Sequence, residues 1–393
     1  MNNSRHWSSN TIWDIGVVSK CKEGETLCGD QCVVERTGNG ATVILSDGLG
    51  SGVKANILST LTATMLTTML QGDVPLEESV AAVAETLPMC KDRKLAYATF
   101  TIVMADGETA RLVQYDNPPA IFLKNGAVKR YHYAAQFIQE KELHESHLTF
   151  EEGDMLVLFS DGVSEAGLGV TTGIGWPQAD IEDFVARNYT PNISAQRMAA
   201  QIVSCVQSLD LNAMHDDTTV TVLKLRSRSV ANVMIGPPEH KDDDLSTMRL
   251  FFAKEGKHIV CGGTTARAVA EFLGEKVRTL PNTGTDAVPP MSEIKGVDLV
   301  TEGVVTLNAA LEIIRNYTFD SMQTLELIGQ TDGAARLAEA LMEDATEINI
   351  LFGNAVNAAQ QDSEFSFEKK LQLIQELQEL LRSMGKNVKF SIC

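Results

Sequence analysis

Residues 41–52, ATVILSDGLGSG, and residues 155–167, MLVLFSDGVSEAG, share one pattern: an apolar run that ends in Ser-Asp-Gly. A continuous apolar run of this length predicts a buried β-strand, and the Asp-Gly pair predicts a tight turn where the strand ends. If both strands belong to one sandwich, their ends can lie at the same edge, where Asp47 and Asp161 would meet. Two adjacent carboxylates repel each other and raise each other's pKa unless a cation lies between them, so the two stretches together indicate a cation site.

Two further carboxylates occupy similar positions. Asp30 precedes a predicted strand at 31–36, and Asp216 precedes a predicted strand at 218–225. Any single Asp-Gly or Gly-Asp pair is typical of a plain turn, whereas a set of acidic residues at strand ends, far apart in the sequence, is a more specific signal. Hard cations such as Mg²⁺ and Mn²⁺ prefer oxygen ligands and keep several waters, so these few side chains are enough to predict a binuclear metal site.

The first half of the chain has mostly the two-residue hydrophobic period of β-strands, interrupted by a few amphipathic helices. This predicts two packed sheets flanked by helices, with helices expected near 53–72, 178–188 and 194–208. The run after Lys54 lacks charge as far as Asp73, but it contains several threonines. We therefore expect a buried core helix there rather than a membrane span.

A change of composition divides the chain. Gly236-Pro237-Pro238 and the acidic run that follows are typical of a linker, so we expect a first domain at 1–228, a linker at 229–247 and a second domain at 248–393. Beyond the linker, strand and helix patterns alternate, beginning with a strand at 248–253, which predicts a smaller α/β domain with a mostly parallel sheet. The fold class expected for the whole chain is α+β.

The net charge, the cysteines and the N-terminal sequence indicate which partners the chain is expected to bind and in which compartment it is expected to lie. The chain of 393 residues carries a formal net charge of −19, which disfavours nucleic acid and anionic membranes as partners. Of its seven cysteines, Cys21, Cys28 and Cys32 lie close together, but their spacing is not CxxC and no second half-site follows, so we expect no zinc site and reduced thiols. The start of the chain is polar and lacks the apolar stretch of a signal peptide, so we expect a cytoplasmic protein.

The chain resembles the PPM-type (type 2C-like) metal-dependent protein phosphatases, in the branch of the bacterial sporulation stage II protein E phosphatases. The resemblance covers about residues 10–226. It rests on Gly29-Asp30, Ser46 to Gly52 (SDGLGSG), Asn117-Pro118-Pro119, Phe159 to Val163 (FSDGV) and Asp216 to Val220 (DDTTV). The fold of this family is an α-β-β-α sandwich with the metals at one edge of the two sheets.

By this resemblance, the cofactors are two divalent metal ions, Mn²⁺ or Mg²⁺. Asp47 bridges them, and the carbonyl of Gly48 binds one of them. Asp161 and Asp216 hold the second ion, and Asp30 binds directly or through water. Asp47 and Asp161 are the residues expected to be catalytic. The implied reaction is hydrolysis of a phosphate monoester by a water that bridges the two ions, without a phosphoenzyme.

Some positions depart from the family pattern. Where the branch often has Met, His and Met, this chain has Leu49, Ser51 and Thr218, none of which is an expected ligand. No arginine stands where the eukaryotic relatives bind phosphate. No cysteine is followed by the five-residue loop and Arg that would cradle phosphate, so we expect metal-dependent rather than cysteine-dependent hydrolysis.

The resemblance implies a serine/threonine phosphatase of a bacterial signalling circuit, with a phosphorylated protein as substrate, such as an antagonist of an anti-sigma factor. Two alternatives stay open: a non-catalytic module of the same fold that acts by binding a partner or ligand, and a phosphatase of small molecules. The helix at 53–72 begins at the loop of Asp47, so a partner that shifts this helix would also shift the metal site. A plain core helix is the alternative for that segment.

Residues 248–393 resemble no family of assignable function. The loop 261–265, CGGTT, joins a predicted strand to a predicted helix, and exposed backbone N–H groups there could bind an anion; a plain tight turn is the alternative. Because open parallel sheets bind ligands at the carboxyl ends of their strands, we expect a sensor or docking domain for a small molecule or a partner protein. A homodimer is one of the oligomeric states that this sequence permits.

Overall fold

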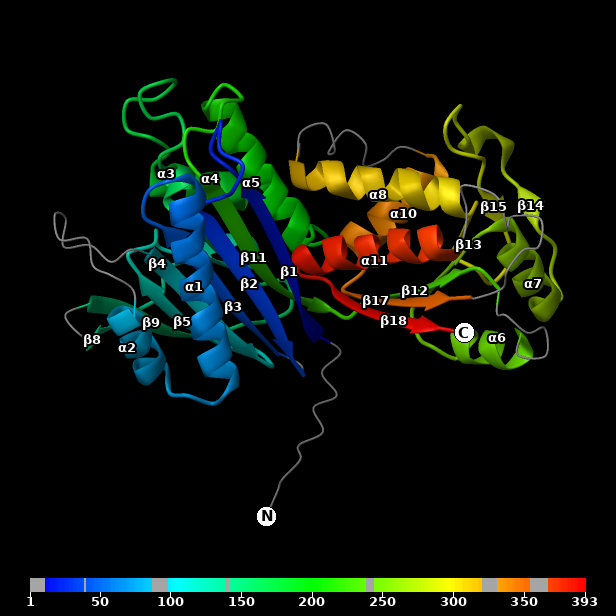
Figure 1. Ribbon diagram of the computed structural model, residues 1–393, viewed down its shortest axis with the longest axis horizontal. Coiled ribbons are helices and arrows are strands. Elements are labelled where there is room, and N and C mark those ends of the chain that lie inside the picture. Colours follow the sequence, from blue (N-terminus) through cyan, green and yellow to red (C-terminus); the bar gives the residue numbers. More distant parts are fainter. Residues whose placement is uncertain are drawn as a thin grey trace, which may run out of the picture. The chain divides into compact units, whose positions relative to one another are not determined.

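The computed structural model describes residues 11–38, 40–86, 98–138, 141–237, 244–319, 331–353 and 367–393. The chain divides into two compact units, Met1–Ser227 and Arg228–Cys393 (Figure 1). Both units combine helices with sheets, which confirms the predicted α+β class.

The first unit contains two antiparallel sheets. The five-stranded sheet has the order β1-β11-β10-β6-β7, with bounds Thr11–Lys20, Thr218–Ser227, Met155–Phe159, Ile121–Lys124 and Ala127–Lys129. The six-stranded sheet has the order β2-β3-β4-β5-β9-β8, with bounds Asp30–Thr37, Gly40–Gly48, Ala98–Asp106, Thr109–Tyr115, Lys141–Thr149 and Ala134–Ile138. The sequence pattern predicts neither β8 nor β9. In β9 most residues are charged or polar, and Leu143 and Leu148 are its only buried apolar residues, so the strand lacks a clear hydrophobic period.

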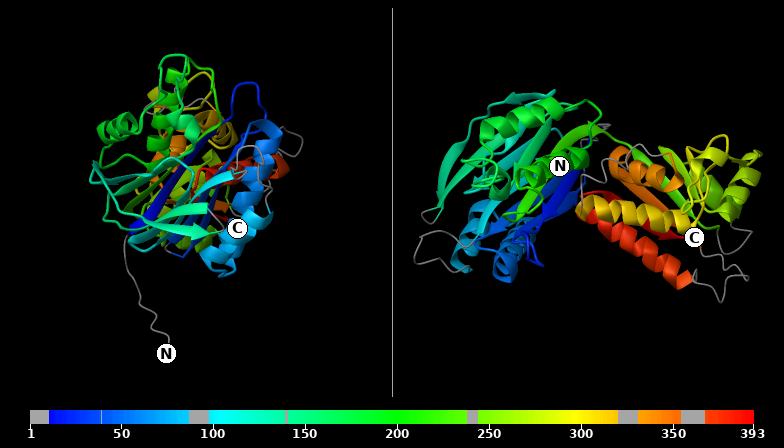
Figure 2. Two further views of the ribbon diagram at one scale, coloured as in Figure 1. Left: turned by 90° about the vertical axis from the view of Figure 1, so that its left-hand side faces the viewer. Right: turned by 90° about the horizontal axis from the view of Figure 1, so that it is seen from above.

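Helices cover the outer face of each sheet, which gives the expected α-β-β-α sandwich (Figure 2). α1 (Gly52–Gln71) and α2 (Leu76–Thr86) pack on the six-stranded sheet. α5 (Ala195–Leu209) packs on β1 and β11, and α4 (Gln178–Asn188) contacts α5. α3 (Asp161–Ser164) is a single turn directly after β10.

The long helix α1 is the core helix that the sequence predicts. Ala63 and Leu66 on its buried face pack against Ile44 and Ile102 of the six-stranded sheet. Within the described ranges, no helix combines the length and the apolar character needed to cross a membrane.

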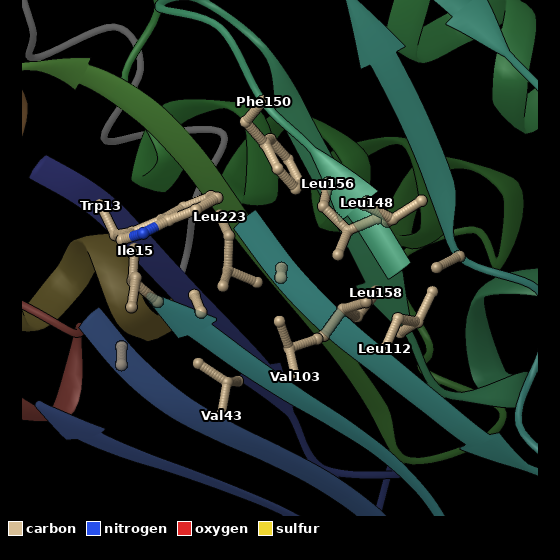
Figure 3. Close-up of a cluster of buried hydrophobic side chains, with 14 of the residues drawn as sticks. Trp13, Ile15, Val43, Val103, Leu112, Leu148, Phe150, Leu156, Leu158 and Leu223 are labelled. Carbon is tan, nitrogen blue, oxygen red and sulfur yellow. The ribbon is translucent and has the colours of Figure 1, made fainter. Parts of the chain in front are cut away.

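A continuous apolar cluster fills the space between the two sheets (Figure 3). It is built from alternate residues on strands of both sheets, such as Val43 on β3 and Leu223 on β11. The ring centroid of Phe150 lies 4.7 Å from that of Trp13 and 4.9 Å from that of Phe122, both in edge-to-face contact. The cluster holds the sheets face to face and so fixes which strand ends share an edge.

The second unit is built on one seven-stranded sheet in the order β14-β15-β16-β13-β12-β17-β18. The five neighbouring strands β16, β13, β12, β17 and β18 are parallel. β15 is antiparallel to both of its neighbours, β14 and β16. In the order of the sheet, the bounds are Arg278–Thr279, Ser292–Glu293, Leu299–Thr301, Lys257–Cys261, Val230–Ile235, Glu347–Phe352 and Asn387–Ile392. This is the mostly parallel sheet that the sequence predicts.

The structure differs from the predicted linker at 229–247. Val230–Ile235 form β12, which lies in the middle of the sheet between β13 and β17. The reason is the apolar run VANVMI, which is buried on both faces of the parallel sheet. Residues 238–243 of the predicted linker lie outside the described residues.

The predicted strand at 248–253 also differs. These residues belong largely to helix α6 (Asp244–Phe252). Met248 and Phe251, three residues apart, both pack into the cluster under the sheet, which is the spacing of a helix rather than of a strand.

The helices of the second unit belong to a doubly wound sheet. α6 and α7 (Gly263–Leu273) contact each other, while α8 (Val304–Phe319) contacts both α10 (Gly333–Glu339) and α11 (Phe367–Ser383), as Figures 1 and 2 show. Two short helical turns, Pro281–Thr283 and Ala340–Asp344, complete the described elements. Numbered along the chain, the parallel strands lie in the order 3-2-1-4-5, so the strand order reverses between β12 and β17.

Replacing Phe150 by Ala is expected to lower the free energy of unfolding of the first unit by about 3–5 kcal/mol, because it leaves a cavity between the sheets. Urea denaturation followed by tryptophan fluorescence measures this change. Phe137→Ala is the matched control, since the side chain of Phe137 is 69% exposed, and we expect it to change the free energy by less than about 0.5 kcal/mol. Equal effects of the two substitutions would contradict the packing described.

Candidate metal centre

Two of the carboxylates predicted as ligands lie on the six-stranded sheet. Asp30 is the first residue of β2, Asp47 is the penultimate residue of β3, and the two are direct partners in the antiparallel register. Opposite residues of an antiparallel pair place their side chains on the same face of the sheet. Asp30 and Asp47 therefore lie side by side at one end of this sheet.

The other two carboxylates lie at the end of the five-stranded sheet. Asp161 opens α3 directly after β10, and Asp216 lies two residues before β11. Because β10 and β11 are antiparallel neighbours, with Phe159 opposite Val220, the end of one strand and the start of the other share an edge.

Ser160 joins the two sheets at this edge. Its hydroxyl donates a hydrogen bond to Asp30 Oδ2 (2.7 Å) and accepts one from the backbone N–H of Thr219 (2.9 Å). Asp161 also lies close enough to Asp47 to raise the pKa of its carboxyl group. The structure thus brings together carboxylates that are separated by more than 100 residues in the sequence.

Burial, together with the crowding of negative charge, raises the pKa values of Asp47 and Asp30. Burial, followed by the charges of Asp30 and Asp161, raises the pKa of Asp47 to about 10. Burial also raises the pKa of Asp30 to about 7, against the opposing effect of its hydrogen bonds with Ser160 and Thr219. In the absence of a cation, this edge therefore holds protons that isolated carboxyl groups would release.

Asp216 is a partly exposed member of the cluster. Burial raises its pKa, while the backbone N–H of Asp217 and the charge of Lys22 lower it. Lys22 Nζ lies 3.8 Å from Asp216 Oδ1, and both side chains are about one-third exposed, so this ion pair contributes little to stability.

These residues fit hard divalent cations. The donors are all oxygens, which Mg²⁺ and Mn²⁺ prefer. Asp30 Oδ1 is buried and has no hydrogen-bond partner among the described residues, so it is a lone acceptor that a cation or its water would satisfy. Within the described part of the chain, no three of the four carboxylates have oxygens within 4.8 Å of one another, so water would complete the coordination of any ion.

The helix α1 contacts this edge through backbone atoms. A Cβ atom on Gly48 would lie 2.1 Å from the carbonyl oxygen of Ala55, so only glycine allows the end of β3 to approach the helix this closely. Asn56 Nδ2 donates a hydrogen bond to the carbonyl of Cys28 (2.8 Å), two residues before Asp30. A shift of α1 would therefore move the backbone on both sides of the carboxylate pair.

The sequence prediction left out Ser160 and Asp217. Both Ser-Asp-Gly motifs contain a serine, but Ser46 donates its hydrogen bond to the carbonyl of Thr99 (3.0 Å), whereas Ser160 binds Asp30. The serines of two identical motifs thus have different hydrogen-bond partners, which the sequence alone does not reveal. Asp217 stands beside Asp216 in the sequence, and this doubled aspartate was the signal that could have drawn attention to it.

When a chelator keeps the chain free of metal, its free energy of unfolding is expected to fall as the pH rises from about 4 towards about 7. The folded state binds the proton of Asp30 more tightly than the unfolded state does, since burial raises its pKa to about 7. The stability that this proton contributes is complete below the unfolded pKa and is lost as the pH rises through the folded pKa, at up to about 1.4 kcal/mol per pH unit.

Urea unfolding at several pH values measures this slope. Asp30→Asn is expected to make it shallower, because Asn can accept the hydrogen bond of Ser160 without ionising, and the slope that remains belongs to Asp47, whose pKa is raised to about 10. Addition of Mn²⁺ should restore stability at neutral pH in the unsubstituted chain. An identical slope in the chain with Asp30 and in the Asn variant would contradict the electrostatic description.

Comparison with known proteins agrees with this fold. Residues 37–226 match the family described as stage II sporulation protein E (SpoIIE). A relative, stage II sporulation protein E of Priestia megaterium, is 24% identical over 222 residues, which make up 55% of this chain and 37% of the relative. The chain therefore spans well under half the length of that relative.

Solved structures show the same likeness. The PP2C phosphatase domain of SpoIIE from Bacillus subtilis, with a fragment of its regulatory domain, is 19% identical and matches 56% of this chain and 64% of that chain, with a TM-score of 0.48. RsbX in complex with magnesium is 16% identical and matches 54% of this chain and 95% of that chain, with a TM-score of 0.40.

The family match covers most of the unit whose two sheets supply the four carboxylates. Its fold, its motifs and its sequence relatives lead to the same assignment. The match of residues 37–226 to the stage II sporulation protein E family supports the description of the first unit as a PPM-type phosphatase domain of that branch.

Proposed function

We propose that this chain is a metal-dependent protein serine/threonine phosphatase that hydrolyses a phosphoserine or phosphothreonine of a bacterial signalling protein in the cytoplasm. The observation that carries the proposal is the meeting of acidic residues from both sheets at one edge of a phosphatase fold. Carboxylates crowded in this way destabilise a fold unless a cation neutralises them, so their presence supports a metal-dependent reaction.

The roles of the residues follow from their places at this edge. Asp47 would bridge two divalent ions, Mn²⁺ or Mg²⁺, and the carbonyl of Gly48 would bind one of them. Asp161 and Asp216 would hold the second ion. Asp30 would bind directly or through water. When bound, the ions supply an activated water and neutralise charge on the phosphoryl oxygens.

The chain's own contacts prepare the site for this reaction. Ser160 holds one oxygen of Asp30 by its 2.7 Å hydrogen bond and so leaves the other oxygen available. Asp161 is exposed, so a phosphorylated side chain can approach from solvent. Of the two groups assigned as catalytic, Asp47 is therefore the more shielded and Asp161 the more accessible.

A protein substrate is supported by the loop that follows α3. Leu168, Val170 and Ile174 in this loop are exposed, and the side chain of Ile174 is 78% exposed. The loop is anchored near the site, since the backbone N–H of Trp176 donates to the carbonyl of Ser164 (2.8 Å). Exposed apolar side chains beside an acidic site favour contact with a polypeptide over a small, highly charged phosphate ester.

The alternative is a non-catalytic module of the same fold that acts by binding a partner or ligand. Such a module has no need for carboxylates that repel one another, so the same four residues favour the enzyme. The two functions differ in one measurable property, which is hydrolysis that depends on both the metal and the carboxylates.

Mn²⁺-dependent hydrolysis of p-nitrophenyl phosphate is the direct test. Asp47→Asn and Asp161→Asn are each expected to lower kcat/KM by at least about a hundredfold, which corresponds to about 2.7 kcal/mol of transition-state stabilisation. Asp183→Asn is the matched control, because Asp183 is an exposed carboxylate on α4 whose side chain is 76% exposed.

The outcome that rejects the enzyme is hydrolysis that persists unchanged in both site variants or in chelator. A phosphoserine peptide should be hydrolysed with a higher kcat/KM than sugar phosphates of equal charge. The reverse preference would favour the small-molecule phosphatase.

For the second unit we propose a sensor or docking function with a ligand site at the carboxyl ends of its parallel strands. The strand order reverses between β12 and β17, which is where open α/β sheets bind ligands. The loop after β13 supports this, since Gly262 has φ +115° and α7 begins directly at Gly263. The ligand would be a small molecule or a segment of a partner protein.

Thermal unfolding of the full-length chain with a panel of nucleotides, sugar phosphates and amino acids tests the small-molecule form of this proposal. A ligand at about 100 times its Kd stabilises the folded state by about 2.7 kcal/mol, which raises Tm by about 5–11 °C. Gly263→Val is expected to abolish the shift without lowering the basal Tm, because a Cβ at Gly263 meets no atom within 4 Å. If no compound of the panel raises Tm, the small-molecule form of the proposal is contradicted.

A further inference from the structure

A second group of metal-ligating side chains lies in the loop between β1 and β2, next to the carboxylate edge. The loop spans residues 21–29, and its two cysteines, Cys21 and Cys28, meet across it. Cys28 Sγ is also held by the carbonyl of Lys20 (3.7 Å). The backbone N–H of Glu23 donates to the carbonyl of Met214 (2.8 Å), which attaches this loop to the segment before β11.

Asp217 from that segment completes the group. Its side chain is only 3% exposed. Its Oδ1 accepts a hydrogen bond from the backbone N–H of Lys22 (3.0 Å), whereas its Oδ2 is buried and has no partner among the described residues. One ligand atom from each of Cys21, Cys28 and Asp217 lies within 4.8 Å of the other two.

Backbone contacts shape the space around these atoms. A Cβ on Gly29 would lie 2.6 Å from Asp217 Oδ2, so the absence of a side chain at Gly29 is what lets this carboxylate approach the loop. The hydrogen bond from Asn56 on α1 to the carbonyl of Cys28 fixes the backbone of one of the two cysteines (2.8 Å). The group is therefore built by packing from three separate parts of the chain.

We propose that Cys21, Cys28 and Asp217 form a binding site for one thiophilic divalent cation of the Zn²⁺ class. Two sulfurs and one carboxylate oxygen match the mixed sulfur and oxygen donors that Zn²⁺ accepts, and a water would fill the fourth tetrahedral position. Sulfur atoms bound to one tetrahedral Zn²⁺ lie about 3.8 Å apart, so atoms that lie within 4.8 Å of one another need to move closer by about 1 Å at most. Binding releases the two thiol protons to solvent and transfers no electron.

This site is distinct from the all-oxygen edge proposed for hydrolysis. Mg²⁺ and Mn²⁺ prefer oxygen ligands, so a pair of thiolates selects against them. The third cysteine of the sequence cluster, Cys32, is not a member, because its Sγ lies against Thr221 Oγ1 (3.2 Å) on β11. A bound ion would tie the β1–β2 loop to the segment that carries Asp216, and so would hold two ligand-bearing segments in place.

Titration of the reduced, Mg²⁺-saturated full-length chain with Cd²⁺ tests the proposal, because cadmium thiolates have a charge-transfer absorption in the ultraviolet. We expect one equivalent of Cd²⁺ per chain to produce this band and Zn²⁺ to displace it. Cys21→Ser and Cys28→Ser should each weaken Cd²⁺ binding at least about tenfold and at least halve the band. Asp217→Asn should weaken binding while keeping the band.

Two controls separate this site from others. Cys205→Ser, which removes a partly buried thiol of α5, should leave the titration unchanged. Asp47→Asn should also leave the band unchanged, so failure of the proposed phosphatase would not affect this result. A band that survives both loop cysteine substitutions, or Cd²⁺ binding without any band, would overturn the proposal.

A second measurement uses the unsubstituted chain, so it does not depend on the folding of variants. Zn²⁺ is expected to protect Cys21 and Cys28 from alkylation by iodoacetamide, as read by peptide mass spectrometry, with no change at Cys205. Equal alkylation with and without Zn²⁺, or a Cys21–Cys28 disulfide in protein kept under reductant, would overturn it.

Discussion

Repulsion between carboxylates is the constraint on which the first unit depends. The apolar cluster between the sheets fixes them face to face, and this packing forces Asp30, Asp47 and Asp161 into one small region. Burial makes the ionisation of Asp30 and Asp47 costly, so the edge holds either protons or cations. The hydrogen bond from Ser160 to Asp30 is the direct link between the two sheets at this point, and it orients one carboxylate while leaving its second oxygen free to accept.

The same edge is surrounded by close backbone approaches that only glycine permits. Gly48 meets the carbonyl of Ala55 on α1, and Gly29 meets both the Cβ of Ala55 and the carboxylate of Asp217. One helix thus touches the end of β3 and the start of β2 together. Asp216 belongs to the carboxylate edge, and its neighbour Asp217 belongs to the group with Cys21 and Cys28. Because the two residues are adjacent, a ligand that orders this segment would affect the geometry of both sites.

The second unit is organised differently, since helices cover its mostly parallel sheet and the ligand site that we propose lies at the carboxyl ends of the strands. β12 is the strand about which the sheet is organised, with β13 on one side and β17 on the other. The chain leaves β12 and β17 through Gly236 and Gly353, and a Cβ on Gly353 would lie 2.1 Å from the carbonyl oxygen of Pro237. A close backbone approach, which a side chain at Gly353 would block, therefore lies where the strand order reverses, the place that the topology favours for a ligand.

The sequence by itself determined the two-layer sandwich, the long core helix, the parallel second sheet and the identity of the acidic residues, because hydrophobic period and Asp-Gly turns are local properties. It misplaced β12 and α6, since short apolar runs near Pro and Gly fit a linker, a strand or a helix equally well. Only the tertiary structure decided which residues meet. Ser160 and Ser46 have the same local motif but different partners, and Asp217 joins Cys21 and Cys28 from almost 200 residues away. The physical reason is that side-chain contacts across two sheets depend on strand register and packing, which no spacing along the chain records.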